Sequence, residues 1–161
     1  MFFRRIAMTL IVSAIAATPL TFGQTTTTTT RNSEAGPVGL GSTETIQITV
    51  VNLASNATSG TAASCTGSIS FNGTTGAVIG TATPFTVTAG QIFSASLPFA
   101  KAASSGVRTE VVGVVSLTTT STSQAPCQLH YAVESFDTAT GATHAYISGT
   151  AGGGNAGGPG R

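Results

Sequence analysis

The sequence predicts an all-β protein, a single antiparallel β-sandwich of about seven strands. Three observations predict this fold class. Between Ser42 and Gly149, apolar and polar residues alternate with a period of two. Clusters of Gly, Asn, Asp, Ser and Pro interrupt the alternation about every ten residues, which is typical of sandwich turns. No stretch has the 3.6-residue period of an amphipathic helix, so we expect almost no helix.

The first 23 residues have the pattern of a secretory signal peptide. A basic start, "MFFRR", precedes the apolar run "IAMTLIVSAIAA", which is too short for a comfortable transmembrane span. Pro19 and small residues follow, with a cleavage site expected near Gly23 or Gln24. We therefore expect a secreted, periplasmic or extracellular (cell-surface) protein with no membrane insertion after cleavage. The alternative is an uncleaved N-terminal anchor.

The segments on either side of the predicted domain lack periodicity. Residues 24–41 contain "TTTTTT" and "RNSEAGPVGLGS", and they are predicted to form a flexible Thr/Gly-rich linker. Residues 150–161 are rich in Gly and are predicted to form a disordered tail. The sandwich domain is accordingly placed at residues 42–149.

The strands can be justified in chain order. The stretch "TETIQITVVNL" places Ile46, Ile48 and Val50 on one face, and "CTGSISF" alternates in the same way from Cys65 to Phe71. The stretches "AVIGTATPFTV" and "QIFSASLPF" flank a turn, "TAGQ". These four stretches are predicted to form four of the strands.

The second half supplies the remaining strands. "RTEVVGVVSLTTT" is apolar on both parities, as in a central strand buried on two sides. "CQLHYAVESF" alternates Leu129, Tyr131 and Val133 against polar or small neighbours, and "ATHAYIS" closes the domain.

Two turns have nearly the same sequence, "SFNGTTGA" and "SFDTATGA", and both are predicted to be hairpin tips. Gly76 and Gly141 can adopt the positive φ that β-branched neighbours avoid. Asp137 can accept a hydrogen bond from its own backbone two residues on. Because Phe136 is out of parity with Cys127, the second strand is predicted to contain a bulge.

The charge balance argues against nucleic acid as a partner. The whole chain has a formal net charge of +1. Removal of Arg4 and Arg5 with the signal peptide leaves four basic and five acidic side chains, so the mature protein is close to neutral. Such a chain cannot neutralise a row of phosphates or hold a basic face to an anionic membrane.

Cys65 and Cys127 are the two cysteines of the chain. An even pair in an exported protein predicts one disulfide. The loop that it closes would contribute roughly 4 kcal/mol through chain entropy. A free, reactive pair is the alternative, although the two residues are too far apart for a CxxC redox motif.

With these residues in place, the chain resembles a known class of proteins. A Cys early in one strand, another opening a late strand, and about seven strands in roughly a hundred residues resemble an Ig-like sandwich with an inter-sheet disulfide. The stretch "PCQLHYAVESFDTATGATHAYI" is similar to a pattern in uncharacterised secreted bacterial β-sandwich proteins. The resemblance covers roughly residues 40–149. It implies an Ig-like fold and export, and it implies no activity. Since the chain has no Trp, Phe71, Tyr131 or Phe136 would replace the Trp that packs on the disulfide.

No metal site, cofactor or catalytic residue is predicted. The spacing Cys127-x-x-His130 suggests a copper site. A copper centre of this kind requires a second His and usually a Met, but the two methionines, Met1 and Met8, lie in the predicted signal peptide. Glu134 and His144 are predicted to face each other across the last hairpin as a surface charge pair. A hydrolase would need a serine nucleophile beside that pair, and no nucleophile-elbow motif is present.

The expected function is that of a non-enzymatic structural or adhesive module of the cell surface or extracellular matrix. Its expected partners are a second copy, another surface protein or a glycan, with strand addition along a free edge as one route. The alternative is a carbohydrate-binding module, for which Tyr146 is the candidate ligand-contact aromatic and Phe93 a second exposed aromatic. A hydrolase with an unrecognised site is the third hypothesis.

Overall fold

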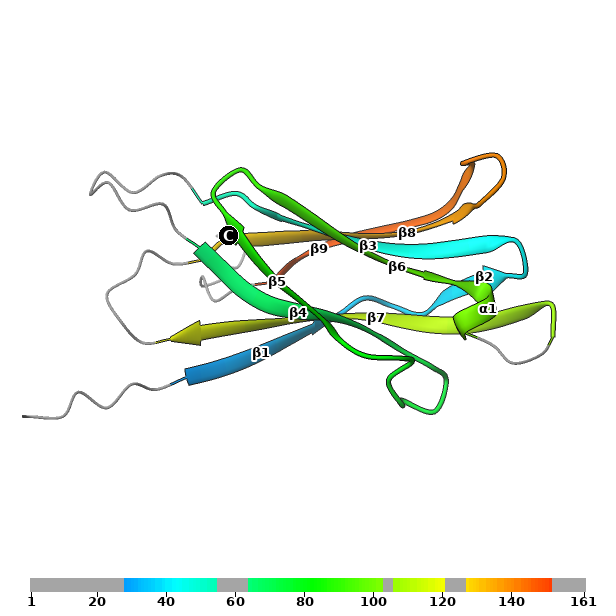
Figure 1. Cartoon of the computed structure of the whole chain (residues 1–161), viewed down its shortest axis with the longest axis horizontal. Helices are drawn as coiled ribbons and strands as arrows, with labels where there is room; N and C mark the ends of the chain where they lie inside the picture. The colour runs from blue at the N-terminus through cyan, green and yellow to red at the C-terminus, as the bar shows by residue number, and fades with distance from the viewer. Residues whose placement is uncertain (1–27, 55–63, 103–105, 121–126, 152–161) are drawn as a thin grey trace, which may run out of the picture.

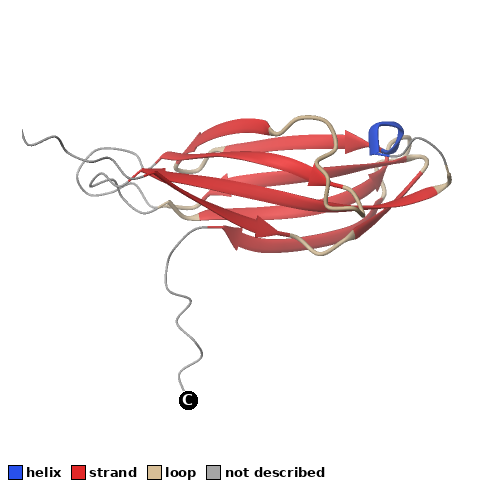
Figure 2. Cartoon of the chain, turned by 90° about the horizontal axis from the view of Figure 1, so that it is seen from below, coloured by secondary structure: helices blue, strands red, loops and turns tan. Residues whose placement is uncertain are grey.

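The computed structural model describes residues 28–54, 64–102, 106–120 and 127–151, which form nine strands and one short helix (Figure 1). The elements are β1 (Thr28–Glu34), β2 (Val38–Gly41), β3 (Glu44–Asn52), β4 (Ser64–Asn72), β5 (Thr83–Thr88), β6 (Ile92–Pro98), α1 (Phe99–Ala102), β7 (Arg108–Thr120), β8 (Leu129–Asp137) and β9 (Thr143–Ala151). Figure 2 shows the helix at one end of the elongated molecule. The predicted signal peptide lies outside the described residues.

The strands form two antiparallel sheets that stack face to face. One sheet has the order β1-β7-β4-β5, with β2 also paired to β7, and the other has the order β6-β3-β8-β9. This confirms the predicted all-β sandwich, with nine strands in the described residues instead of about seven. The turn "TAGQ", with Gly90 at φ 78°, carries the chain from β5 in one sheet to β6 in the other.

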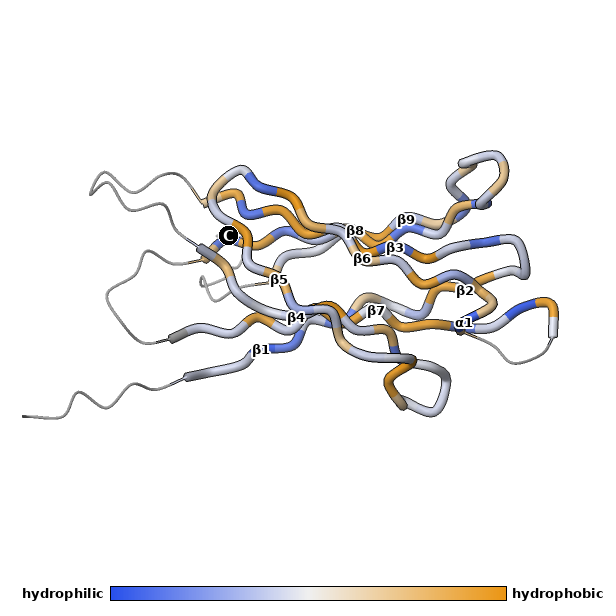
Figure 3. The backbone as a smooth tube through the Cα atoms, in the orientation of Figure 1, coloured by the Kyte–Doolittle hydropathy of each residue, from blue (hydrophilic) through white to orange (hydrophobic). Residues whose placement is uncertain are grey.

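The core lies between the two inner faces. Figure 3 shows that hydrophobic residues occur along the strands of both layers. Ile46, Ile48 and Val50 of β3 are fully buried, as the period of two predicts. From β8, Tyr131 and Val133 point inward in the same way. Alternation alone therefore identified the buried face of these two strands.

The strand β7 is the central strand of its sheet, since it pairs with β1, β2 and β4. Val111, Val115 and Leu117 on its inner face are buried, and Val114 on its outer face is also only 5% exposed. The predicted central position is therefore confirmed, but burial on both faces is not: Val112 and Ser116 on the outer face are only half-buried, because the described residues place no further layer over it.

The predicted flexible linker at residues 24–41 is wrong over its described part. Residues 28–34 form β1 and residues 38–41 form β2, and both pair with β7. Val38 and Leu40 belong to the core at 2% and 0% exposure. The backbone groups along one edge of the long strand β7 need hydrogen-bond partners. The two short strands β1 and β2 supply them, although their sequences show little alternation. Likewise, β9 continues through Thr150 and Ala151, which were assigned to the tail.

A disulfide joins Cys65 to Cys127, with the two Cα atoms 5.4 Å apart. Cys65 is in β4 of one sheet, and Cys127 lies just before β8 of the other. The predicted pairing and its inter-sheet position are therefore confirmed. Phe71 and Tyr131 belong to the same core as Cys65, whereas Phe136 lies on the outer face, opposite Thr45.

Both of the similar turns reverse the direction of the chain. Asp137 and Gly141 close the β8–β9 hairpin as predicted, with Gly141 at φ 73°. The other turn also reverses the chain as predicted: Gly76 has φ 78°, the N–H of Gly73 donates to the carbonyl of Ala77 at 2.9 Å, and an antiparallel bridge joins Asn72 to Val78, although β5 begins only at Thr83. The described residues include no helix that could span a membrane, since α1 has only four residues.

Candidate functional site

The outer face of the β6-β3-β8-β9 sheet carries the best candidate site. On each strand of this sheet, the residues that do not point into the core form rows across the four strands. One row consists of small residues, Ser94, Thr49, Ala132 and Ser148. Larger residues flank it, so the row of small residues forms the floor of a depression that crosses the strands.

A shallow hollow of about 450 Å³ follows this row, and we call it the outer-face hollow. It is lined by Thr49, Val51, Leu53, His130, Tyr131, Ala132, Tyr146, Ser148, Gly149 and Thr150. None of these side chains is Lys, Arg, Asp or Glu. The lining therefore combines hydroxyl groups, a histidine and apolar surface, with no fixed charge.

Large apolar side chains beside the hollow are left in water. Tyr146 is 65% exposed and Leu53 is 53% exposed, and Ile92, which is paired to Val51, is 67% exposed. An exposed Leu or Ile alone needs no explanation, and the register places these three side chains in different rows of the sheet. Tyr146 and Leu53 are the two that line the hollow, so they are the exposed apolar groups that a ligand in it would meet. The structure confirms that Tyr146 is exposed. It contradicts the same expectation for Phe93, which packs against Phe85 with ring centroids 5.9 Å apart.

Polar groups next to the hollow are held in fixed positions by one another. The hydroxyls of Thr49 and Ser94 lie 2.9 Å apart, and Gln47 Nε2 donates to Thr49 Oγ1 at 3.2 Å. Ser96 Oγ in turn donates to Gln47 Oε1 at 3.2 Å. These bonds orient donors and acceptors across β6 and β3 before any ligand arrives.

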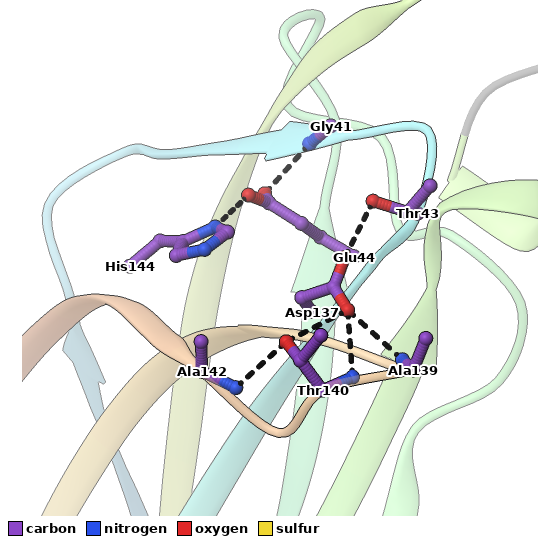
Figure 4. Close-up of polar contacts among 8 residues, drawn as sticks. All are labelled: Gly41, Thr43, Glu44, Asp137, Ala139, Thr140, Ala142 and His144. Atoms are coloured by element: carbon purple, nitrogen blue, oxygen red, sulfur yellow. Dashed lines mark hydrogen bonds and ion pairs between the residues drawn. The ribbon is translucent and has the colours of Figure 1, made fainter.

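A second polar cluster lies at the end of the molecule near the β8–β9 hairpin (Figure 4). The imidazole Nδ1 of His144 forms an ion pair and hydrogen bond with Glu44 Oε1. The other carboxylate oxygen of Glu44 accepts a hydrogen bond from the backbone N–H of Gly41 at 2.7 Å. That hydrogen bond, then the contact with His144 and the charge of Arg108, lower the pKa of Glu44 below its ordinary value.

The predicted pairing of Glu134 with His144 is wrong. Glu134 lies opposite Tyr146, two residues further along β9. The hairpin tip is one residue longer than the prediction requires, with Phe136 opposite Thr143, and the register shifts by one more residue between Ser135 and Phe136. The predicted irregularity is present at that point, but the extra residue is His144 of β9 and not a residue of β8. His144 lies at the bulge, and its imidazole bonds to Glu44 of β3 instead of Glu134.

Asp137 organises the hairpin tip beside this cluster (Figure 4). Its Oδ1 accepts hydrogen bonds from the backbone N–H groups of Ala139 (3.0 Å) and Thr140 (2.8 Å), and Thr43 Oγ1 donates to its Oδ2 at 2.8 Å. The predicted bond two residues on is thus confirmed. Together these bonds, with the Thr140 backbone first, lower the pKa of Asp137 to about 2.

A second hollow, of about 350 Å³, lies beside the Glu44–His144 pair. Ser135 lines it together with Glu44 and His144. A serine, a histidine and a glutamate together raise the possibility of nucleophilic catalysis. However, Ser135 is 1% exposed, and its hydroxyl is buried without a hydrogen-bond partner. A substrate would not reach this oxygen, and no hydrogen bond connects it to His144.

The described residues contain no group of three or more His, Cys, Asp or Glu side chains that could hold a metal ion. The sulfur of Cys127 is in the disulfide, and His130 lies on the outer face of its sheet. Sequence reasoning missed Glu44, Leu53 and Ile92. Leu53 could have been found, because it has the same parity as Val51 and so belongs to the outer face. The partner of His144 could not, because it depends on a bulge whose position the sequence does not give.

Comparisons of this chain with protein-family models, with curated proteins and with solved structures found no match.

Proposed function

We propose that this protein is an exported, non-enzymatic adhesive module of the cell surface or extracellular matrix that binds its partner through the outer-face hollow. One observation carries the proposal: Tyr146 and Leu53 stand exposed beside a recessed, uncharged floor of small hydroxyl-bearing residues. Fully burying side chains of this size contributes about 1.5–3 kcal/mol each, and a partner seated on the hollow would recover part of that free energy. Large apolar side chains exposed around a hollow are typical of interaction surfaces.

A neutral glycan is the partner that this chemistry favours. The lining offers hydroxyls of Thr49, Ser148 and Thr150 for hydrogen bonds and the ring of Tyr146 for the apolar face of a sugar. An anionic or cationic ligand would find no opposite charge in the lining. The carbohydrate-binding hypothesis and the adhesive one therefore converge on one surface.

Two features support export and the absence of catalysis as parts of this proposal. The disulfide between Cys65 and Cys127 suits an oxidising compartment, in keeping with the signal-like start of the sequence. Ser135 is the serine beside the Glu44–His144 pair, and its burial keeps it from serving there as the nucleophile that the hydrolase hypothesis requires.

Binding of the mature protein to an array of neutral glycans and to cells of the producing organism tests the proposal. Tyr146→Ala is expected to weaken binding by about tenfold or more, since an exposed aromatic anchor dominates such contacts. Val78→Ala is the matched control, because Val78 is 52% exposed on the β4–β5 connection, in the other layer, and should have no effect.

Periodate treatment of the cells separates the two kinds of partner, because it destroys the vicinal diols of sugars. Loss of binding after treatment supports a glycan. If binding persists after treatment but is still weakened by Tyr146→Ala, the protein is an adhesive module whose partner is a protein and not a glycan. Unchanged binding by the Tyr146→Ala protein overturns the proposed surface.

A further inference from the structure

The free edge of β9 differs from the other sheet edges in the described part of the chain. An edge strand presents unpaired N–H and C=O groups, and proteins usually block such edges with charges, prolines, bulges or short strands. β1 carries Arg31 and Glu34, β5 contains Pro84, and β6 ends at Pro98. β2 is four residues long, and the N–H of its last residue already bonds to Glu44.

β9 has no such protection over residues 145–151. This stretch contains no charged residue and no proline, and it pairs regularly with β8 from Ala145 to Ala151. The bulge at His144 lies just before it. In an antiparallel ladder, the backbone groups that do not bond to β8 point outward along the edge.

We propose that β9 pairs with β9 of a second copy of this chain, in antiparallel orientation about a two-fold axis, which joins two four-stranded sheets into one continuous sheet. A two-fold interface brings the same strand of both copies together, so a charge at the axis would meet a like charge directly. The uncharged stretch avoids that repulsion entirely.

The side chains of β9 are compatible with this pairing. With Ser148 opposite Ser148 of the second copy, Tyr146 lies opposite Thr150. Aromatic and β-branched residues form favourable cross-strand pairs. Tyr146, 65% exposed in one copy, would lose part of its contact with water.

The pairing would also affect the proposed binding surface, and this consequence rests on the proposed function. Tyr146, Ser148 and Thr150 line the outer-face hollow, and the two-fold axis would place two hollows next to each other on one sheet. Two linked sites bind a repetitive surface much more tightly than one, because the second contact is intramolecular.

Sedimentation of the mature protein over a range of concentrations, without any glycan, tests the pairing. We expect a monomer–dimer equilibrium in the wild type. Ser148→Lys places two ammonium groups opposite each other and should raise the dimer dissociation constant by about tenfold or more. Ser148 is exposed, so the substitution should leave the fold intact, and circular dichroism checks this.

Ser96→Lys is the matched control, since Ser96 is exposed on the outer face of the same sheet but on its opposite edge strand, β6. It should sediment as the wild type does. Amide hydrogen exchange supplies an independent readout: protection of β9 amides should rise with protein concentration, and protection of β6 amides should not. A wild type that remains monomeric at all concentrations, or equal effects of both substitutions, overturns the proposal. Because no glycan is present, this result is independent of whether the hollow binds sugar.

Discussion

The ring of Tyr131 in β8 lies across Gly149 in β9, its direct cross-strand partner, so that a β-carbon on Gly149 would come within 2.6 Å of the ring. The other sheet repeats this arrangement, since Phe85 of β5 lies over its partner Gly67 in β4. An aromatic ring that covers a cross-strand glycine supplies the packing that the glycine lacks. In each sheet, one pair of an aromatic residue and a glycine therefore fixes the register of an edge strand, which is β9 in one sheet and β5 in the other.

Gly67→Ala is expected to destabilise the protein by about 1–3 kcal/mol or more through overpacking. The new methyl group would lie 2.8 Å from Cζ of Phe85 and would collide with the backbone oxygen of Ser116, which cannot move without disturbing β7. Urea denaturation measures the change. Gly73→Ala is the control, because its nearest neighbour would be the side chain of Ile79 at 3.7 Å. Equal stability of both variants would contradict the close packing described for Gly67.

Removal of the disulfide is expected to cost roughly 4 kcal/mol, because the bond closes a loop with a sequence separation of 62 residues. The double variant Cys65→Ser, Cys127→Ser should therefore unfold at a much lower urea concentration than the wild type. The native protein should take up no thiol-alkylating reagent until it is reduced. Labelling of both sulfurs without reductant would show that the pair is free.

Acid should destabilise the protein partly through Asp137. The pKa of Asp137 falls from about 3.8 when unfolded to about 2 when folded, so its stabilising contribution is complete above pH 4. The contribution is lost as the pH falls from 4 through 2, where the carboxylate protonates. Thermal unfolding of wild type and Asp137→Asn should therefore show a clear difference in Tm at pH 6 that shrinks towards pH 2. A difference that stays constant over this range would exclude the carboxylate as its source.

The fold class, the buried faces of β3 and β8, the central position of β7 and the disulfide could all be predicted from the sequence, because each rests on local alternation or on a pair of residues. The partner of His144 could not, because it depends on where the register shifts. The hairpin tip pairs Phe136 with Thr143, and the extra residue at His144 shifts the register by one more, so Glu134 lies opposite Tyr146 and His144 bonds to Glu44. The pairing register of two strands is set by all of their cross-strand contacts together, and a local sequence pattern does not determine it.

The strands β1 and β2 were missed for a different reason. The stretch "TTTRNSE" buries almost nothing and pairs through its backbone, and "VGLG" alternates over only four residues. Neither is long or apolar enough to stand out from a loop. Their pairing with β7 is a tertiary contact between residues far apart in sequence.

Leu40→Ala tests whether this N-terminal segment is part of the domain. Leu40 is fully buried in the core, so its truncation should leave a cavity and cost about 2–5 kcal/mol. Leu53→Ala, at a site that is 53% exposed, is the matched control and should change stability by no more than about 0.5 kcal/mol. Urea unfolding of both variants measures the contrast. If Leu40→Ala were as stable as the control, β2 would not be packed against the sandwich, and residues 24–41 would be a linker after all.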